Sequence, residues 1–310
     1  MLTYTGRIAN KTMGRLKNLI RALRLPFATA SVLPYILGSI IARAEFIPLN
    51  FILGFIAVLC THLSANLIND YADSKSGADW QDRSFYRFFG GSKLIQEKVF
   101  SERFYLAASV SCFSLAFINV VILAFILKSL SIVIFYLGIL LLAVSYSQKP
   151  LQFSYHRIGE VIIFLLFGPA LVMGGYFIQT KIFPTMEGFI LSLPFGFLTT
   201  AILFANEIPD FPEDAKTGKF TWVSVSGPKN AYMIYYCLEF CAFLAIVSCV
   251  VLRYLSPIAL LSLVFIFPVF KAADILRKFA FDKKRLIESS KLTIMVQTVV
   301  SIILILGVAI

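Results

Sequence analysis

The chain has 310 residues, of which 59% are hydrophobic and only 15% are charged. This composition excludes a soluble globular domain and predicts a membrane protein with several spans. The net charge of +11 raises nucleic acid as a partner, but the bases lie between apolar runs in the way that reports membrane topology. No nucleic-acid partner is therefore expected.

The first 26 residues combine basic side chains with apolar residues at helical spacing. Six Lys and Arg residues alternate there with Met13, Leu16, Ile20 and Leu23. This pattern predicts an amphipathic cytoplasmic N-terminal segment over residues 1–26, which lies on the membrane surface ahead of the first span.

Nine later windows are long and apolar enough to cross a bilayer as helices. They are 27–43, 50–70, 104–127, 130–147, 158–179, 186–208, 230–252, 255–274 and 290–310. We therefore expect an all-α, multi-pass transmembrane bundle of nine helices around a central cavity. The bundle is expected to form one domain over residues 1–310.

The distribution of bases predicts the orientation. If the N-terminus is cytoplasmic, the loops after the second, fourth, sixth and eighth windows share its side and hold most of the 28 Lys and Arg residues. The other side receives Arg43, Lys128, Lys181 and Arg253. Because cytoplasmic loops are enriched in Lys and Arg, this asymmetry places the N-terminus and the polar loops in the cytoplasm, with the protein in the cell membrane.

An acidic motif closes the window 50–70. In a helix, Asn66, Asp70 and Asp73 fall at i, i+4 and i+7 and share one face. A carboxylate at bilayer depth costs about 2.5–3.5 kcal/mol, so this face belongs at a helix end or in a hydrated cavity, opposite a positive charge. Clustered carboxylates with room for water suit Mg²⁺ better than Zn²⁺.

A second acidic motif closes the window 186–208. Asn206 and Asp210 repeat the spacing of Asn66 and Asp70, and Asp214 follows. Both windows run in the same direction, so both motifs fall on the cytoplasmic face. This predicts two parallel four-helix repeats, followed by a ninth helix, whose motifs build one site. For either motif alone, the alternative is a hydrophilic helix end that turns into a loop.

Two polar segments follow the acidic motifs. Residues 73–102 include the run Phe89-Gly-Gly-Ser-Lys93, and a loop of that length without a function is uncommon. The segment after the second motif carries Lys216 and Lys219. Both segments can offer cations and backbone donors to an anionic ligand. Solvated positive charge is the alternative interpretation of any single base here.

Two histidines and one run with glycine and proline are further features of the sequence. His62 lies one turn before Asn66, where a lone histidine is more often a packing residue than a ligand. His156 is expected in a loop. The run Phe167-Gly168-Pro169 permits a kink in the window 158–179.

Two acidic clusters flanked by bases suit a substrate with a diphosphate head and an apolar tail. Mg²⁺ bridges carboxylates to phosphate oxygens, and Lys or Arg side chains absorb the charge of a departing diphosphate. An allylic cation left behind needs a dry pocket with aromatic faces, for which 31 Phe and 13 Tyr residues are available.

The two motifs, together with Tyr146 and Lys149 at the end of the window 130–147, resemble the UbiA superfamily of intramembrane prenyltransferases. The resemblance covers nearly the whole chain. Gly90-Gly-Ser-Lys93 and the run Asn206 to Asp210 most resemble the branch that prenylates 1,4-dihydroxy-2-naphthoate (MenA-like). Gly77 occupies the place where many relatives that act on 4-hydroxybenzoate have a third Asp, whereas Asp79 matches the MenA-like spacing.

The resemblance implies Mg²⁺-dependent transfer of a polyprenyl group from polyprenyl diphosphate to a small aromatic acceptor, which loses a carboxyl group in menaquinone biosynthesis. It implies two Mg²⁺ ions held by Asp70, Asp73, Asp79, Asp210 and Asp214. The residues implied to bind the diphosphate are Asn66, Asn206, Lys75, Lys93, Arg157 and Lys219. The catalytic set is Asp70, Asp73, Asp210 and Asp214, with Tyr146 shielding the allylic cation and Lys149 compensating phosphate charge.

Several alternatives stay open at this point. The alternative acceptors are 4-hydroxybenzoate, homogentisate and a glycerol-phosphate lipid. A cation transporter would also use acidic residues in a membrane, although the windows 27–43, 104–127, 230–252 and 290–310 carry almost no ionisable residues for a path. A phosphotransferase of the CDP-alcohol type ranks last because its Asp-Gly-x-x-Ala-Arg run is missing from the sequence.

Overall fold

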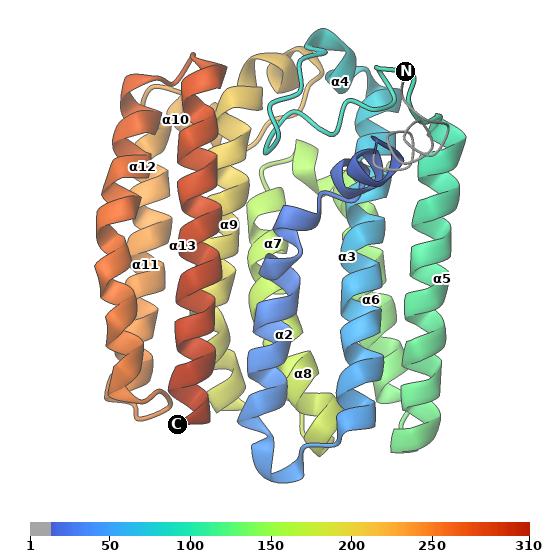
Figure 1. The fold of residues 1–310 in the computed structure, drawn as a ribbon, viewed down its shortest axis with the longest axis vertical. Helices are drawn as coiled ribbons and strands as arrows, with labels where there is room; N and C mark the ends of the chain where they lie inside the picture. Colours follow the sequence, from blue (N-terminus) through green and yellow to red (C-terminus); the bar gives the residue numbers. More distant parts are fainter. Residues whose placement is uncertain (1–13) are drawn as a thin grey trace, which may run out of the picture.

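The computed structural model describes residues 14–310, whose regular elements are helices packed side by side, with the connections at the two ends of the bundle (Figure 1). The main helices are α2 (Thr29–Ile41), α3 (Pro48–Ser76), α5 (Glu102–Leu127), α6 (Ser131–Ser147), α7 (Gly159–Leu165), α8 (Leu171–Thr180), α9 (Met186–Lys216), α11 (Ala231–Val251), α12 (Ile266–Lys278) and α13 (Lys283–Ala309). Shorter pieces are the turns Leu25–Phe27, Arg43–Glu45 and Phe153–Tyr155, the 3₁₀ helix Pro257–Phe265, α4 (Ala78–Gln81) and α10 (Val223–Ser226).

The nine expected windows all fall on helices, but nine spans is more than helix length and composition support. Within residues 14–310, seven helices are long and apolar enough to cross a membrane, or eight if the bent pair Gly14–Ala22 and Leu25–Ile41 is one span. The remaining window is α6, whose 17 residues are apolar but short. The protein is therefore a multi-pass helical bundle with seven to eight candidate spans.

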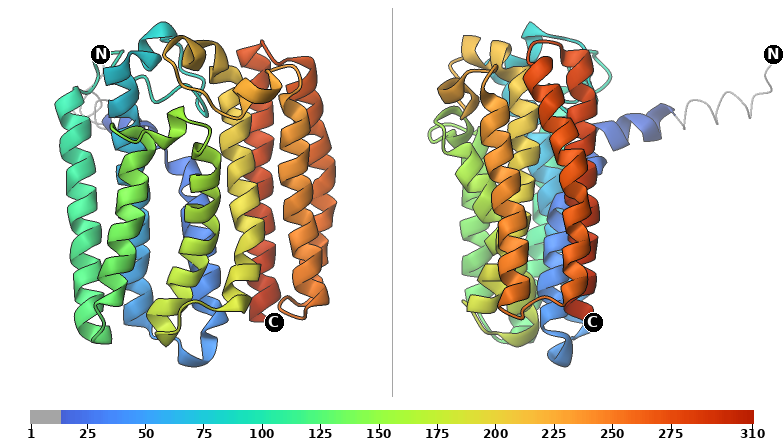
Figure 2. Two further views of the ribbon diagram at one scale, coloured as in Figure 1. Left: turned by 180° about the vertical axis from the view of Figure 1, so that it is seen from behind. Right: turned by 90° about the vertical axis from the view of Figure 1, so that its left-hand side faces the viewer.

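Part of the amphipathic N-terminal segment lies within the described chain. Gly14–Ala22 is helical, is bent by 45° from the helix that follows, and projects from the side of the bundle (Figure 2, right). Leu16, Leu19 and Ile20 are exposed on it. A surface helix needs such an exposed apolar side, and its position on a membrane stays a prediction. Residues 1–13 lie outside the described residues.

The two acidic motifs end helices that point to the same end of the bundle, where α4 and α10 also lie (Figure 1). Helix α3 ends at Gly77, whose φ of 88° is the left-handed conformation that commonly terminates a helix at a glycine. Helix α9 extends to Lys216 despite Pro209 and Pro212 within it. The last turns of both helices therefore bring their carboxylates to one level of the bundle.

Helices α7 and α8 join through a π-helical turn over Leu166–Ala170. Pro169 lies in this turn and has no N–H to donate, which explains why the regular hydrogen-bond pattern changes there. A Cβ on Gly168 would lie 2.9 Å from Cα of Gly196 on α9. The run Phe167-Gly168-Pro169 thus both reshapes the helix and permits the close approach of α9.

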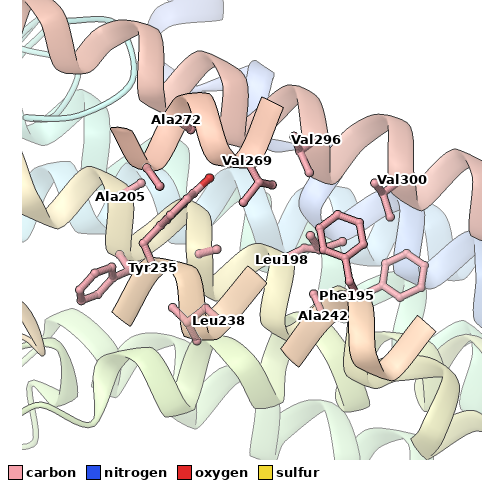
Figure 3. Packing of buried hydrophobic residues seen from close by; sticks show 14 of the residues in the cluster. Phe195, Leu198, Ala205, Tyr235, Leu238, Ala242, Val269, Ala272, Val296 and Val300 are labelled. Atoms are coloured by element: carbon pink, nitrogen blue, oxygen red, sulfur yellow. The ribbon is translucent and has the colours of Figure 1, made fainter. Parts of the chain in front are cut away.

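Helix α9 lies at the centre of the main hydrophobic core. Phe195 and Leu198 on α9 are fully buried and pack with Tyr235 of α11, Val269 of α12 and Val296 of α13 (Figure 3). Because this helix is packed on several sides, the second acidic motif stands on a rigid support.

Candidate active site

A cavity of about 240 Å³ opens at the end of the bundle where the acidic motifs lie. Its polar wall comes from the last turns of α3 and α9, from the loop after α3, and from Arg24 and Lys283 near the starts of α2 and α13. Its deeper wall comes from α6, the α7–α8 turn and α9. The polar residues of the expected site that line it are Asn66, Asp73, Asp79, Lys93, Tyr146, Asn206, Asp210, Asp214 and Lys219.

Two of the three expected residues of the first motif, Asn66 and Asp73, line the cavity, and the third, Asp70, does not. Asn69 and Asp73, again at i and i+4, line the cavity, whereas Asp70 is not among the lining residues. Asp70 is 2% exposed, pairs with Arg24 and accepts the backbone N–H of Ser92 at 3.1 Å. A helix turns by 100° per residue, so Asp70 and Asp73 lie some 60° apart on α3 and only one faces the cavity squarely. The structure thus places Asp70 behind the wall.

Asn69 is the residue of this motif that sequence reasoning missed. Its Nδ2 donates to Oδ2 of Asp73 at 3.2 Å, and its Oδ1 accepts the hydroxyl of Ser147 at 2.7 Å. Asn69 therefore orients the carboxylate of Asp73 and links α3 to the end of α6. The signal was available, because Asn69 and Asp73 have the same spacing as Asn206 and Asp210.

The run Gly90-Gly91-Ser92-Lys93 contacts three of the five acidic residues. The N–H of Gly90 donates to Oδ2 of Asp210 at 2.9 Å, and the N–H of Ser92 donates to Asp70. The third contact joins Nζ of Lys93 to Oδ1 of Asp79 at 2.8 Å. Gly90 and Gly91 have φ values of 72° and 75°, which non-glycine residues rarely adopt. The long loop after α3 is thus an ordered part of the site.

Asp79 and Lys93 form a buried ion pair within this loop. Burial, followed by the charge of Asp73, raises the pKa of Asp79 to about 7, while the ammonium group of Lys93 opposes the shift. Asp79 therefore changes charge near neutral pH.

The second motif is paired with Lys219. Nζ of Lys219 lies 3.1 Å from Oδ2 of Asp214. Burial disfavours the ammonium charge, but the carboxylates of Asp214 and Asp73 outweigh it and raise the pKa of Lys219 well above its ordinary value. Oδ1 of Asn206 is buried without a hydrogen-bond partner in the described chain. The cavity is therefore lined by both a cation and an amide oxygen that is free to accept a hydrogen bond.

Three of the expected phosphate-binding bases are not brought to the cavity. Lys75 pairs with Glu102 at 2.5 Å, Lys149 is exposed, and Nε of the exposed Arg157 donates to Ser224 at 3.1 Å. Lys75 fails because residues i and i+2 of a helix do not share a face, so it points away from Asp73. Lys149 lies beyond the end of α6 at Ser147, where its side chain is exposed.

Two bases that the motifs did not indicate take part instead. Arg24 lines the cavity and pairs with Asp70, and Lys283 reaches Asp82 at 3.0 Å and Glu213 at 2.9 Å. Both lie far in sequence from the acidic residues that they contact. Only the packing of α2 and α13 against the motif-bearing helices could reveal them.

An apolar cavity of about 140 Å³ lies next to the polar one. It is lined mainly by aliphatic and aromatic side chains from α3, α5, α6 and the α7–α8 segment, including Val120, Ile132 and Phe177. The two cavities share part of their walls, formed by His62, Ala65, Ala143, Leu166 and Phe167. A ligand with a charged head and an apolar tail fits this arrangement.

The carboxylates suit Mg²⁺ when phosphate supplies the remaining ligands. Within residues 14–310, no three His, Cys, Asp or Glu side chains form a group that would hold a metal ion by themselves. Mg²⁺ is typically bound by one or two carboxylates, several waters and substrate phosphates, so this spread fits a metal that arrives with a diphosphate. Asp73 and Asp79 on one wall, with Asp210 and Asp214 on the other, are the oxygens available.

The structure is a multi-pass helical bundle with a charged cavity at one end and an apolar cavity next to it. The UbiA prenyltransferase family model matches residues 31–306, and the chain belongs to that family. It is thus a prenyltransferase.

Individual relatives and structures agree with this assignment. The chain is 30% identical over 245 residues to UbiA prenyltransferase domain-containing protein 1 of Gallus gallus, covering 78% of this chain and 71% of that protein. It is 27% identical over 236 residues to 1,4-dihydroxy-2-naphthoate octaprenyltransferase of Bacillus subtilis (strain 168), covering 74% of this chain and 72% of that protein.

Solved structures share the fold. The apo structure of a UbiA homologue from Aeropyrum pernix K1 superposes with a TM-score of 0.70 at 16% identity, covering 90% of this chain and 97% of that one. A UbiA homologue from Archaeoglobus fulgidus bound to DMAPP and Mg²⁺ gives a TM-score of 0.56 at 14% identity, covering 91% and 98%.

Proposed function

We propose that this protein transfers a polyprenyl group from polyprenyl diphosphate to 1,4-dihydroxy-2-naphthoate, with two Mg²⁺ ions at the diphosphate. The observation that carries the proposal is the polar cavity, which is lined by carboxylates together with Arg24, Lys93, Lys219 and Lys283 and which shares part of its wall with the apolar cavity. One cavity suits the head of the substrate and the other its tail.

The cavity residues divide by charge. Asp73, Asp79, Asp210 and Asp214 hold the metal, which when bound neutralises the diphosphate and makes it a better leaving group. Lys93, Lys219 and Arg24 bind phosphate oxygens directly, and Asn66 and Asn206 complete the head site. Asp70 acts through Arg24, which it orients.

Tyr146 lies in the deeper part of the polar cavity, beside Gly159 of α7. A Cβ on Gly159 would lie 3.3 Å from Cε2 of Tyr146, so the glycine makes room for the ring. A tyrosine face next to the reacting carbon stabilises the allylic cation and keeps water away from it.

The choice of acceptor rests on two supports. The relative from Bacillus subtilis is named as a 1,4-dihydroxy-2-naphthoate octaprenyltransferase. The run Gly90 to Lys93, which resembles that branch, contacts three acidic residues of the site. The other candidate acceptors are 4-hydroxybenzoate, homogentisate and a glycerol-phosphate lipid.

We extend the proposal to the membrane. The two acidic motifs belong to parallel four-helix repeats, with α13 as the ninth helix, and the end of the bundle that carries the cavity faces the cytoplasm. The four bases assigned to the other side, Arg43, Lys128, Lys181 and Arg253, all lie at helix ends, which suits an interfacial position.

Product analysis tests the function. The purified protein in detergent is incubated with Mg²⁺, geranylgeranyl diphosphate and a mixture of the candidate acceptors, and products are weighed by mass spectrometry. The expected product is a prenylated naphthol that has lost one carboxyl group. A different prenylated ring would change the assigned acceptor and leave the reaction class standing. Failure of both product formation and Mg²⁺-dependent diphosphate binding would refute the proposal and favour transport.

A further inference from the structure

His62 lies where the two cavities meet. It stands on α3, one turn before Asn66, and only 7% of it is exposed. Of the residues that line both cavities, namely His62, Ala65, Ala143, Leu166 and Phe167, it alone has a polar side chain. A diphosphate in the polar cavity and its tail in the apolar one are joined at this shared wall, so the reacting carbon lies next to His62.

One ring nitrogen of the imidazole has a hydrogen-bond partner and the other has none. Its Nδ1 lies 2.6 Å from Oγ of Ser31, and its ring packs edge-on against Phe167 with centroids 6.0 Å apart. Its Nε2 is buried and has no hydrogen-bond partner anywhere in residues 14–310. Leaving a buried polar atom unpaired costs roughly 1–3 kcal/mol, so an orphaned nitrogen at a cavity wall indicates a ligand.

We propose that Nε2 of His62 binds the hydroxyl group of the aromatic acceptor and takes its proton as the acceptor attacks the prenyl chain. This inference rests on the proposed function, because it needs an acceptor with an ionisable hydroxyl. If Nδ1–H donates to Ser31, the lone pair lies on Nε2, the tautomer that the step requires. His62 then touches the substrate and acts as a general base.

The step balances without any further reactant. A bond forms between an acceptor ring carbon and C1 of the prenyl chain, while the C1–O bond breaks and the diphosphate leaves with the electron pair. The hydroxyl proton moves to Nε2, and the ring oxygen becomes a carbonyl. When that ring carbon then loses its carboxylate as CO₂, the electron pair of the broken C–C bond returns to the ring oxygen, which takes the proton back from His62.

Chemical rescue separates a base from a packing residue. His62→Ala removes the base and leaves space at the shared wall, into which added imidazoles of different pKa can diffuse. General bases typically contribute 10²–10⁴-fold, so we expect kcat to fall at least about 100-fold and to be partly restored by imidazole. The restored rate should rise with the pKa of the added base, which a packing role would not produce.

Two further variants keep the test decisive if His62→Ala unfolds. His62→Gln retains a polar side chain of similar reach but does not act as a base, so kcat should fall while Mg²⁺-dependent binding of geranylgeranyl diphosphate stays unchanged. His156→Gln is the matched control, because His156 is the other histidine of the chain and lies exposed in a loop. It should match the wild type.

The outcomes separate this inference from the proposed function. If the wild type turns over and the kcat of His62→Gln lies within about threefold of the wild-type value, the role of His62 is overturned and the function stands. Rescue that does not depend on the pKa of the added base also overturns it. Absence of a prenylated aromatic product from the wild type refutes the function and, with it, this inference.

Discussion

The backbone N–H of Gly90 donates to Oδ2 of Asp210 at 2.9 Å, which ties the loop after α3 to the second acidic motif on α9. The same loop donates the N–H of Ser92 to Asp70 of the first motif, so two backbone hydrogen bonds from one loop connect motifs that are far apart in sequence. The loop that makes it also carries Lys93, the partner of Asp79. Closing the site therefore depends on the conformation of a few loop residues.

The glycine next in the loop provides the first prediction. Gly91 has a φ of 75°, and a Cβ there would lie 2.5 Å from Oδ2 of Asp79. Gly91→Ala should reduce diphosphate binding more than tenfold because Asp79 must move. Gly218→Ala is the control, since Gly218 has the same φ of 75° and no neighbouring atom within 4 Å. Both variants should lose about 1–2 kcal/mol of folding stability. Only Gly91→Ala should also lose diphosphate binding, as measured by titration calorimetry. Equal losses of binding in the two variants would contradict this account.

The register of the first motif provides the second prediction. Asp73→Asn and Asp210→Asn should abolish the Mg²⁺ dependence of geranylgeranyl diphosphate binding, because both carboxylates line the cavity. Asp70→Asn should keep that dependence but lower the melting temperature, since it leaves Arg24 without its partner. Loss of one member of a buried pair costs roughly 3–5 kcal/mol, and less here because Arg24 borders the cavity. If Asp70→Asn lost the Mg²⁺ dependence and Asp73→Asn kept it, Asp70 and not Asp73 would be the metal ligand.

The raised pKa of Asp79 leads us to expect that the affinity for Mg²⁺ depends on pH. Its pKa near 7 means that the metal-free carboxyl is mostly protonated at pH 6 and must release the proton when Mg²⁺ binds. Affinity should therefore rise by about tenfold from pH 6 to pH 8 and then level off, because each unit below the pKa costs a factor of ten. Proton release during Mg²⁺ titration in weak buffer measures this directly. A flat profile would show that Asp79 is already ionised at pH 6.

The same shift has a consequence for stability. A carboxyl whose pKa is higher in the folded protein than in the unfolded chain binds more protons when folded. The metal-free protein should therefore lose stability as the pH rises from about 4 through 7, and Mg²⁺ with diphosphate should reverse the loss. Thermal unfolding at pH 5 and pH 8, with and without ligand, tests this. Equal melting temperatures of the metal-free protein at both pH values would contradict it.

The basic residues provide a further contrast. Lys219→Met should weaken diphosphate binding more than tenfold, because its ammonium is a cation inside the cavity. Lys149→Met should stay within about threefold of the wild type, because Lys149 is exposed outside the cavity. Competition binding with inorganic diphosphate reports both. A large loss of diphosphate binding in Lys149→Met would show that Lys149 takes part in the site.

The cavity itself followed from the sequence to a large extent. Clustered carboxylates in apolar helices predicted a polar site, and Asp73, Asp79, Asp210 and Asp214 all line it. Spacing along a helix does not reveal which of several acids faces inward, because Asp70 and Asp73 stand only 60° apart and the rotation of the helix is set by its neighbours. That is why spacing alone did not single out Asn69, which lines the cavity, and did not show that Asp70 pairs with Arg24 instead of lining it.

The sequence by itself determined the class of architecture and the chemistry, because apolar length and the cost of charge in a bilayer leave few alternatives for such a chain. Tertiary structure alone decided which bases serve the site. Lys75 and Arg157 carry the right charge but do not line the cavity, whereas Arg24, just before the turn Leu25–Phe27, and Lys283, at the start of α13, do. It also decided that His62 lies at the wall shared by two cavities, since a cavity exists only once several helices have packed together.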